Sequence, residues 1–388
     1  MVKKIAKKNW SSSFNLIGKP IIKDFSFKIN EQKDGSEWIY NSLNLGIDCG
    51  EKCGVVYCEM MGGYSSRGDN VIYAHGKNES GNDDFDARLE IAWDDRLDKD
   101  ILEEVGDLCF ITVGLEKTED DKTFYKKFLS AYDAIAYIKE NITTDTVLNV
   151  KGRLKYSMYK EQVQVKKEIN SIVLSRVDDT SKYDARFTQS ILLNKNSVGE
   201  PDKTKGILPI YAKVLDYAKE IDGCEVKGQY PFEKAFEYEV DLSNKELVKK
   251  VITKIFKVKK DVTQITFTGR FVEGGAVVQA TLNDLPDDIK ELIECGAYTE
   301  EEALAACSDN GNREKRMVLE KPVIKKVGDE ENTSYAIQKF ENQYTEEDLV
   351  IELEKKVEKP KVKPKKKEED ETPFDEDDDA GLDWLDKI

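Results

Sequence analysis

Residues 147–156 read VLNVKGRLKY, and residues 264–272 read QITFTGRFV. Both stretches contain an apolar residue, a variable residue, the pair Gly-Arg and a second apolar residue, in that order. Each follows a segment whose apolar residues have helical spacing, Ser130–Asn141 in the first case and Asn244–Phe256 in the second. Strand-like segments precede each helix, and one more follows each Gly-Arg strand. The chain therefore presents the same order of elements twice.

This order is that of a five-stranded oligonucleotide/oligosaccharide-binding (OB) barrel, with a helix between the third and fourth strands. We predict the strands of the first barrel at 13–29, 38–49, 54–61, 147–157 and 163–177. Those of the second are predicted at 183–193, 207–217, 236–242, 262–272 and 316–327. An insertion at 65–128 is partly β (85–93 and 108–115), and short helices are predicted at 287–295 and 299–307. We expect a mainly β protein with a few helices, built as tandem OB-like barrels.

The predicted division of the chain has five parts. They are a basic N-terminal arm (1–12), a first OB-like domain (13–178), a second one (179–328), a connecting segment (329–358) and a tail (359–388). Residues 359–367 hold six lysines and no acid, whereas residues 368–388 hold eleven acids and one lysine. A segment with so much charge and so little apolar surface cannot form a core, so we expect a disordered tail that is Lys-rich and then acidic.

The composition indicates a soluble protein of 388 residues, with 39% hydrophobic and 35% charged residues. No stretch approaches the roughly 18–20 apolar residues of a membrane helix, and the basic N-terminus lacks the apolar run of a secretory signal. We therefore expect a cytoplasmic protein without a membrane partner. The net charge of −17 does not exclude nucleic acid, because residues 368–388 alone carry −10 of it.

The cysteine count points to free thiols, since seven is an odd number in a long chain. A zinc site formed by Cys49, Cys53, Cys58 and His75 is a minor alternative, because the spacing lacks a C-x-x-C pair. Ordinary buried or half-buried thiols are the favoured interpretation. We expect no metal and no other cofactor.

Catalytic motifs are missing from the sequence: there is no P-loop, no G-x-S-x-G and no H-E-x-x-H. Any nucleophile activated by histidine would depend on His75, the single histidine of the chain. The pairs Asp83-Asp84 and Asp94-Asp95 could hold Mg²⁺ in a nuclease, but paired acids in Asp-rich loops are mostly solvated turns. We expect no enzymatic activity.

The first predicted barrel carries a row of cations. In the strand at 147–157, Lys151, Arg153 and Lys155 share one face, and the alternate apolar residues share the other. Lys166 follows on the next strand. Such a row can bind phosphates, although a solvated strand face is its commoner meaning.

Aromatic residues occur on the same kind of outward face. Trp38 and Tyr40 alternate with the apolar residues of their strand, so they can stack on bases or pack under the insertion. In the second barrel, Tyr211, Lys213 and Arg270 form a weaker set of the same type. We predict all of these residues, with the four cations of the first barrel, as contacts to single-stranded DNA.

The chain resembles single-stranded DNA-binding proteins, particularly those of bacteriophages. The shared features are the barrel-like order of strands, a Lys-rich linker and an acidic C-terminus that carries apolar residues. Residues 375–388 read DEDDDAGLDWLDKI. The resemblance implies that the barrels bind single-stranded DNA and that the tail docks on replication and repair proteins. Bacterial members end in Pro-Phe, whereas here Pro373-Phe374 precedes the acids. The tail residues given this role are Phe374, Asp377, Asp378, Asp379, Leu382, Trp384, Leu385 and Ile388.

The sequence thus favours a non-enzymatic protein that binds and protects single-stranded DNA during replication or recombination, with weak sequence preference. Its acidic tail would recruit partner proteins and compete weakly with DNA. The alternatives are a β-rich structural or assembly protein of a virion, and a metal-dependent nuclease or replication accessory enzyme. All three are compatible with an acidic tail, but cationic strands combined with an apolar tip favour the first.

Overall fold

The structure is a computed structural model. It describes residues 5–160, 162–177, 179–274, 290, 293, 299, 300, 315–327 and 334–351. The helices predicted at 287–295 and 299–307 lie almost entirely outside these residues, and the tail with its predicted contacts lies wholly outside them. None of the helices in the described part of the chain is long and apolar enough to cross a membrane.

Five strands of the N-terminal half close into a ring, which we call the first ring. Its strands in ring order are β1 (Ser12–Ile21), β3 (Trp38–Asp48), β4 (Val55–Ser65), β10 (Gln162–Leu174) and β9 (Leu148–Tyr159), and β9 pairs again with β1. The β4–β10 pair is parallel and the others are antiparallel. Helix α2 (Ala131–Asn141) precedes β9 and buries Ala134, Ile135 and Ile138. Apart from the first strand, which ends at Ile21, these are the strands and the helix expected from the sequence, in the order of an OB barrel.

The C-terminal half closes in the same way into the second ring. Its strands in ring order are β11 (Asp184–Leu193), β12 (Ile207–Ile221), β13 (Cys224–Glu239), β15 (Lys315–Pro322) and β14 (Thr263–Glu273). Here β13 and β15 form the parallel pair. Helix α3 (Lys245–Val251) continues into a π-helical turn (Ile252–Phe256). That turn places the buried Phe256 ring against Phe267, with ring centroids 5.6 Å apart. The expected fold class, mainly β with few helices, is confirmed.

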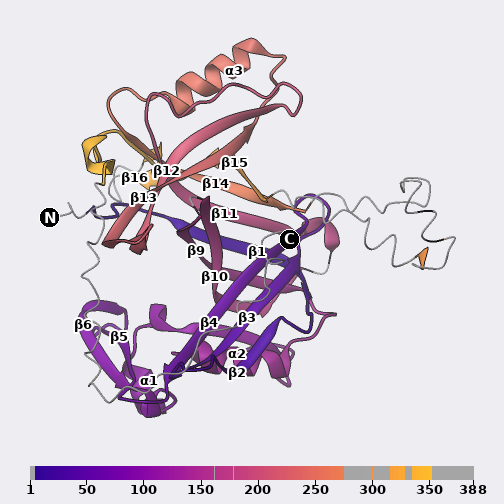
Figure 1. Ribbon diagram of the computed structural model, residues 1–388, viewed down its shortest axis with the longest axis vertical. Helices are drawn as coiled ribbons and strands as arrows, with labels where there is room; N and C mark the ends of the chain where they lie inside the picture. Colours follow the sequence, from indigo (N-terminus) through magenta and orange to yellow (C-terminus); the bar gives the residue numbers. More distant parts are fainter. Residues whose placement is uncertain are drawn as a thin grey trace, which may run out of the picture.

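The two rings are joined by direct strand pairing, because β1 and β11 run antiparallel beside each other (Figure 1). The repeated Gly-Arg pattern occupies equivalent positions in the two rings: Gly152 pairs with Phe14, and Gly269 pairs with Phe187. A Cβ atom at Gly152 would lie 2.7 Å from the Phe14 ring, and one at Gly269 would lie 2.3 Å from the Phe187 ring. A carbonyl oxygen of the neighbouring strand is as close or closer, Glu168 O at 1.9 Å from the Gly152 position and Val318 O at 2.3 Å from that of Gly269. Each glycine is therefore required because a backbone carbonyl and an aromatic ring of the core leave no space for a Cβ.

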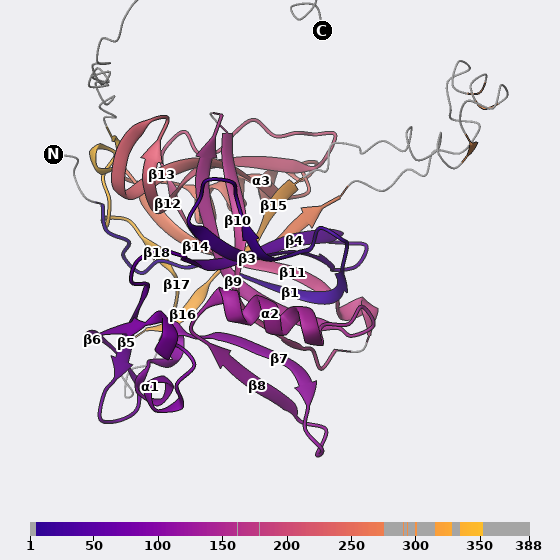
Figure 2. The same ribbon diagram turned by 60° about the horizontal axis from the view of Figure 1, so that its bottom comes forward.

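The insertion forms a separate lobe, seen at the lower left of Figure 1 and standing apart from the rings in Figure 2. It has its own small core around Ile91, Val105 and Phe110. Its elements are β5 (Val71–Lys77), β6 (Asp83–Ala92), α1 (Lys99–Glu104) and the 3-10 turns Trp93–Asp95 and Asp107–Cys109. Strands β7 (Ile111–Lys117) and β8 (Thr123–Phe128) then extend the main sheet from β10.

Three predicted strands differ from those observed. The segment 13–29 contains a turn, in which Ser26 N donates to Lys23 O, so that β2 (Phe27–Gln32) is a separate strand paired with β3. The segment 316–327 divides at Val323 into β15 and β16 (Ile324–Val327), and β16 pairs with β17 (Ser334–Ile337). Strand β13 begins at Cys224, well before the predicted position 236.

The N-terminal arm is docked on the second ring from residue 5 onward. The Tyr344 hydroxyl donates to Ala6 O and accepts from Lys8 N, and the Gln264 amide donates to Lys8 O. Ile5 enters a small apolar cluster that includes Leu349. The C-terminal contacts to the arm come from Gln338, which precedes β18 (Lys339–Phe340), from Tyr344 and from Leu349 in the 3-10 turn Glu347–Leu349. The arm thus belongs to the folded body, and the proposed domain boundaries remain a prediction.

Candidate nucleic-acid interface

The outer face of β3 and β4 presents aromatic side chains. Trp38 is 43% exposed and Tyr40 is half-buried, whereas the alternate residues Leu43, Leu45 and Ile47 are buried as the sequence predicts. The insertion therefore does not cover Trp38. Farther along the same face, the ring of Tyr57 lies over Gly46, where a Cβ would come within 3.2 Å of it. These aromatic side chains lie where unpaired bases could stack on them.

The predicted cationic row on β9 is exposed, but much of its charge is neutralised. Arg153 and Lys155 both pair with Glu168 on β10, at 2.6 and 3.1 Å. Burial alone would raise the pKa of Glu168, but these two cations hold it below the usual value. Lys151 has no ion pair within the described residues. The row therefore offers fewer free charges than its sequence indicates.

A groove of about 500 Å³ opens where the first ring meets the second. We call it the junction groove; its lining residues include Lys23, Phe25, Tyr57, Glu59, Lys166 and Lys315. A buried ion pair, Lys167 of β10 with Glu273 of β14, joins the two rings at the same place. Asn44 and Val55 extend the groove onto the outer face of β3 and β4.

The charges of the junction groove are only partly paired. Lys166 binds Glu59 at 2.9 Å, and Lys167 binds Glu273. Lys23 lies over the Phe25 ring, 5.7 Å from its centroid, and Phe25 is 58% exposed. Neither Lys23 nor Lys315 forms an ion pair with any described residue. The groove thus combines two available ammonium groups with an exposed aromatic ring.

Sequence reasoning found only Lys166 among these groove residues. Lys23 and Phe25 lie in the turn between β1 and β2, inside a segment predicted as one strand. Lys315 belongs to the other ring, which lies beside the first ring only in the folded protein, where β1 pairs with β11. The sequence held no clear signal for these residues, because a single apolar residue such as Phe25 near a lysine is common on protein surfaces.

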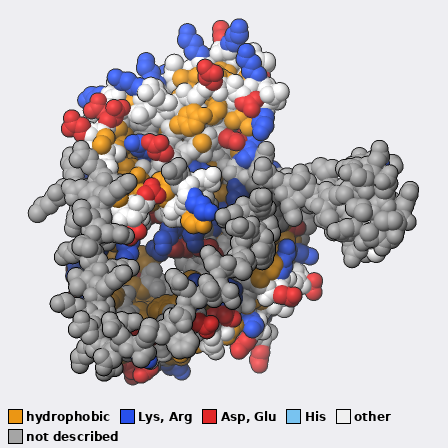
Figure 3. Space-filling model, in the orientation of Figure 1, with side chains coloured by type: hydrophobic (Ala, Val, Ile, Leu, Met, Phe, Trp, Pro, Cys, Tyr) orange, Lys and Arg blue, Asp and Glu red, His pale blue; other side chains and the backbone are white. Residues whose placement is uncertain are grey.

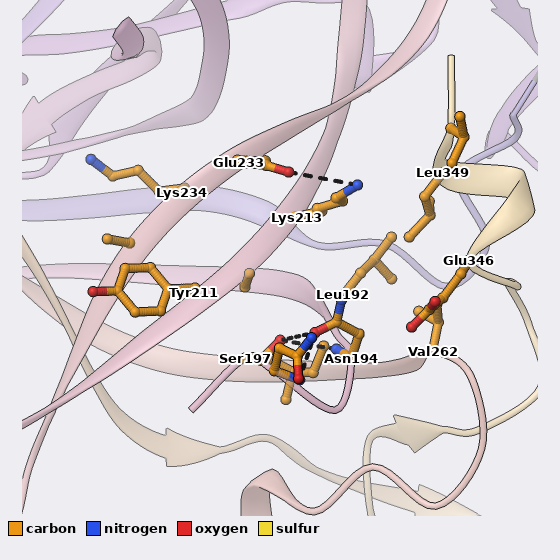
Figure 4. A pocket seen from close by; sticks show the side chains of 15 residues that line it. Leu192, Asn194, Ser197, Tyr211, Lys213, Glu233, Lys234, Val262, Glu346 and Leu349 are labelled. Carbon is orange, nitrogen blue, oxygen red and sulfur yellow. Dashed lines mark hydrogen bonds and ion pairs between the residues drawn. The ribbon is translucent and has the colours of Figure 1, made fainter. Parts of the chain in front are cut away.

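The predicted residues of the second ring separate into two places. Tyr211, which is 55% exposed, and Lys213, which lies 3.7 Å from Glu233, line one pocket on β12 and β13 (Figure 4). Arg270 lies on β14 with its side chain only 12% exposed and its guanidinium bound to Glu320, at 2.8 Å, and to Glu239. We therefore leave Arg270 out of the candidate interface.

The described surface mixes charges of both signs on the face shown in Figure 3. Figure 3 shows Lys and Arg side chains interspersed with Asp and Glu on one face of the molecule. A strand of nucleic acid would therefore be held by a few well-placed unpaired cations and aromatic rings. No broad basic patch is visible on the part of this face that the structure describes.

His75 forms a contact that superficially matches a nucleophile–base–acid arrangement. Its Nε2 lies 2.7 Å from Asp83 Oδ1, and Cys109 Sγ lies 3.2 Å from Nδ1 and 3.8 Å from Nε2. Because the sulfur is almost equally close to both ring nitrogens, it sits over the ring and not in line with a lone pair. Direct proton transfer between the thiol and the imidazole is disfavoured in this geometry.

The zinc alternative also fails on geometry. His75 lies in the lobe, whereas Cys49, Cys53 and Cys58 belong to the buried core of the first ring. Burial raises the pKa of Cys58 to about 12, which disfavours the thiolate that zinc requires. Among the described residues, no three His, Cys, Asp or Glu side chains are grouped so that they could hold a metal ion.

Comparison with known proteins gives little more. No family model matches the chain, and no curated protein matches it. Among solved structures, the chain is similar to the wild-type single-stranded DNA binding protein from Thermus aquaticus. The two are 10% identical, the match covers 69% of this chain and 87% of that one, and the TM-score is 0.30. A deletion mutant of the same Thermus aquaticus protein is 12% identical, and that match covers 68% of this chain and 87% of the mutant, with a TM-score of 0.29. Similarity at this level is too weak to transfer a fold or a function.

Proposed function

We propose that this chain binds single-stranded DNA without chemically altering it, along the outer face of β3 and β4 and into the junction groove. The observation that supports this most is the groove itself. Lys23 and Lys315, which form no ion pair with any described residue, line it together with the exposed Phe25. Ammonium groups bind phosphates and release their counterions, and aromatic rings stack on bases. Trp38 and Tyr40 would continue the stacking surface along β3.

The proposal specifies single strands because stacking on Trp38 and Phe25 requires bases that are not already stacked on both faces in a duplex. Stacking of this kind tolerates any base, so we expect weak sequence preference along the first ring. Each stacked base contributes roughly 1–3 kcal/mol. We expect a few such contacts, together with phosphate contacts from Lys23 and Lys315, to hold the strand despite the negative net charge.

A third lysine adds to the positive potential beneath the groove. Lys234 of β13 forms no ion pair with any described residue, and burial and the nearby Lys167 together lower its pKa. Its ammonium group, next to the Lys167–Glu273 pair, leaves this internal cluster with an excess positive charge. A phosphate at the mouth of the groove would relieve that excess, so DNA binding should favour the charged form of Lys234.

The decisive experiment is a titration of labelled poly-dT at several salt concentrations, with wild type and the Lys23→Ala/Lys315→Ala double variant. We expect the variant to bind more weakly and its log–log salt slope to be shallower by about 1.4, since each lost phosphate contact removes about 0.7. The matched control is Lys139→Ala/Lys245→Ala, which removes two exposed lysines on helices away from the groove. Wild-type protein that ignores poly-dT at low salt would contradict the proposed function.

We also propose that the acidic tail recruits replication or repair proteins, as the sequence resemblance implies. Residues 368–388 combine eleven acids with Trp384, Leu385 and Ile388. Removing them should leave DNA affinity unchanged or higher, because a competing anion is lost. Trp384→Ala should weaken the binding of a partner protein and leave DNA binding unchanged. A tail deletion that abolished poly-dT binding would contradict this role.

A further inference from the structure

The second ring contains a pocket of about 420 Å³ on the outer side of β12 and β13. We call it the second-ring pocket; its lining residues include Leu192, Asn194, Asn196, Tyr211, Glu346 and Leu349. Figure 4 shows Tyr211 and Lys234 on one side of the space and Glu346, Leu349 and Val262 on the other. Its size is in the range of sites that enclose small organic groups.

The loop at one edge of the pocket is fixed by its own hydrogen bonds. Asn194 Oδ1 accepts from Asn196 N at 2.9 Å, and Asn194 N donates to Ser197 Oγ at 2.9 Å. Tyr211 N donates to Ser197 O at 2.7 Å, which ties the loop to β12. Because the side-chain oxygen of Asn194 is occupied, its NH₂ group is the part left to contact a ligand.

One wall of the pocket is apolar and belongs to a buried cluster. Leu192, Val262 and Leu349 are each at most 6% exposed, and they pack in the cluster that anchors the N-terminal arm. At the other end, Tyr211 lies so close to Gly199 that a Cβ there would be 2.6 Å from Cε2 of the ring. The tyrosine ring is therefore supported on one side while more than half of its side chain stays exposed to solvent.

The charges that line the pocket balance, so they give no net attraction for a phosphate. Glu346 and Glu233 both line it, as do Lys213, which lies 3.7 Å from Glu233, and Lys234, which forms no ion pair with any described residue. A carboxylate only accepts hydrogen bonds, so a ligand that displaces water from the exposed Glu346 must carry donors such as N–H groups. An uncharged flat ring with donors and acceptors on its edge satisfies the apolar walls, the amide of Asn194 and the carboxylate of Glu346 together.

We propose that the second-ring pocket takes a single unpaired nucleobase of the bound strand and discriminates between bases through Glu346. This inference rests on the proposed function, and it adds selectivity at one position to the sequence-tolerant stacking on the first ring. Guanine is the expected preference, because it presents two adjacent N–H donors to one carboxylate and an acceptor oxygen to an amide. Thymine, with a single ring N–H, is the weakest match.

The test compares two single-stranded 20-mers, dT20 and a T-rich sequence with an isolated guanine at every fourth position. Wild type should bind the guanine-containing strand at least roughly fivefold more tightly, the lower limit expected for a bidentate contact. In Glu346→Gln this ratio should fall to about twofold or less, because the amide can no longer accept both donors. Glu347→Gln is the matched control: it removes an equally exposed neighbouring charge that does not line the pocket.

The outcomes separate the two proposals. Both substitutions remove one negative charge, so both can strengthen binding to any strand, and only the ratio between strands reports on the pocket. An unchanged ratio in Glu346→Gln, or a wild type that binds the two strands within twofold of each other, would overturn the nucleobase pocket while leaving DNA binding intact. If wild type binds neither strand, the proposed function itself is wrong.

Discussion

The buried ion pair between Lys167 and Glu273 is the most consequential residue contact in the described structure. Each side chain is 6% exposed, and the Lys167 ammonium also lies 4.6 Å from the centroid of Phe271. In Glu273→Gln the lysine would stay buried without a countercharge. We expect the free energy of unfolding, measured by urea denaturation, to fall by about 3–5 kcal/mol.

The control for this substitution is Glu37→Gln, which removes an exposed partner of Arg67. Exposed pairs contribute about 1 kcal/mol or less, so this variant should unfold almost like wild type. Equal effects of the two substitutions would show that the Lys167–Glu273 pair does not stabilise the contact between the rings.

At the residue scale, the alternation of residues along a strand correctly predicted which face a side chain occupies. It did not predict which carboxylate a cation would pair with. The sequence placed Lys151, Arg153 and Lys155 on an exposed face, and all three are exposed. It could not place Glu168 beside two of them, because that contact depends on the register between β9 and β10. Arg270 is the same case: its carboxylate partners Glu239 and Glu320 lie 31 and 50 residues away in the chain. Free charge is therefore the property that sequence reasoning overestimates.

At the element scale, the carboxylate of Asp83 links strands β5 and β6 of the lobe to the 3-10 turn Asp107–Cys109. Asp83 of β6 accepts from Leu108 N at 3.0 Å and contacts His75 of β5. The Leu108 amide, with His75 in addition, lowers the pKa of Asp83. Because the folded pKa lies below the unfolded one of about 3.9, these contacts stabilise the lobe at higher pH and are lost as pH falls through the folded value.

We therefore expect the Leu108 amide to lose its protection against solvent exchange, and to approach its intrinsic rate, as the pH falls below about 3.9 and through the lowered folded pKa of Asp83. Asp83→Asn should abolish this pH dependence, because the amide side chain does not titrate. The measurement is hydrogen exchange by NMR between pH 3 and pH 6, with an amide of β9 as internal reference. Identical profiles for wild type and variant would contradict this role of Asp83.

Element prediction succeeded where local pattern determines structure. Strands β9 and β14 and helix α2 have strong periodicity, and they lie where the sequence places them. The predicted strands of the β12–β13 hairpin were too short, because the turn between them was not recognised. Asp222-Gly223 is the residue pair favoured in a two-residue hairpin turn, and both residues have positive φ (47° and 78°). The junction groove could not be predicted from such patterns, because Lys23 and Lys315 meet only after both rings have formed.

On the scale of the whole molecule, the two rings should unfold as one unit. They share the pairing of β1 with β11, and one hydrophobic cluster runs from Leu16 in the first ring to Phe271 in the second. The lobe has a separate cluster around Ile91. A substitution in one ring should therefore weaken both rings, whereas a substitution in the lobe core should act only on the lobe.

Leu16→Ala tests this coupling, because Leu16 is fully buried in β1. The cavity left by the substitution should lower the free energy of unfolding by about 2–5 kcal/mol. Hydrogen exchange followed by mass spectrometry should show protection falling by the same factor in peptides from β9 and from β14, although β14 belongs to the other ring. Ile91→Ala is the control, and its effect should be confined to β5, β6 and α1. Protection lost in β9 alone would mean that the rings unfold independently, and the junction groove between them would then be an interface that DNA binding itself must stabilise.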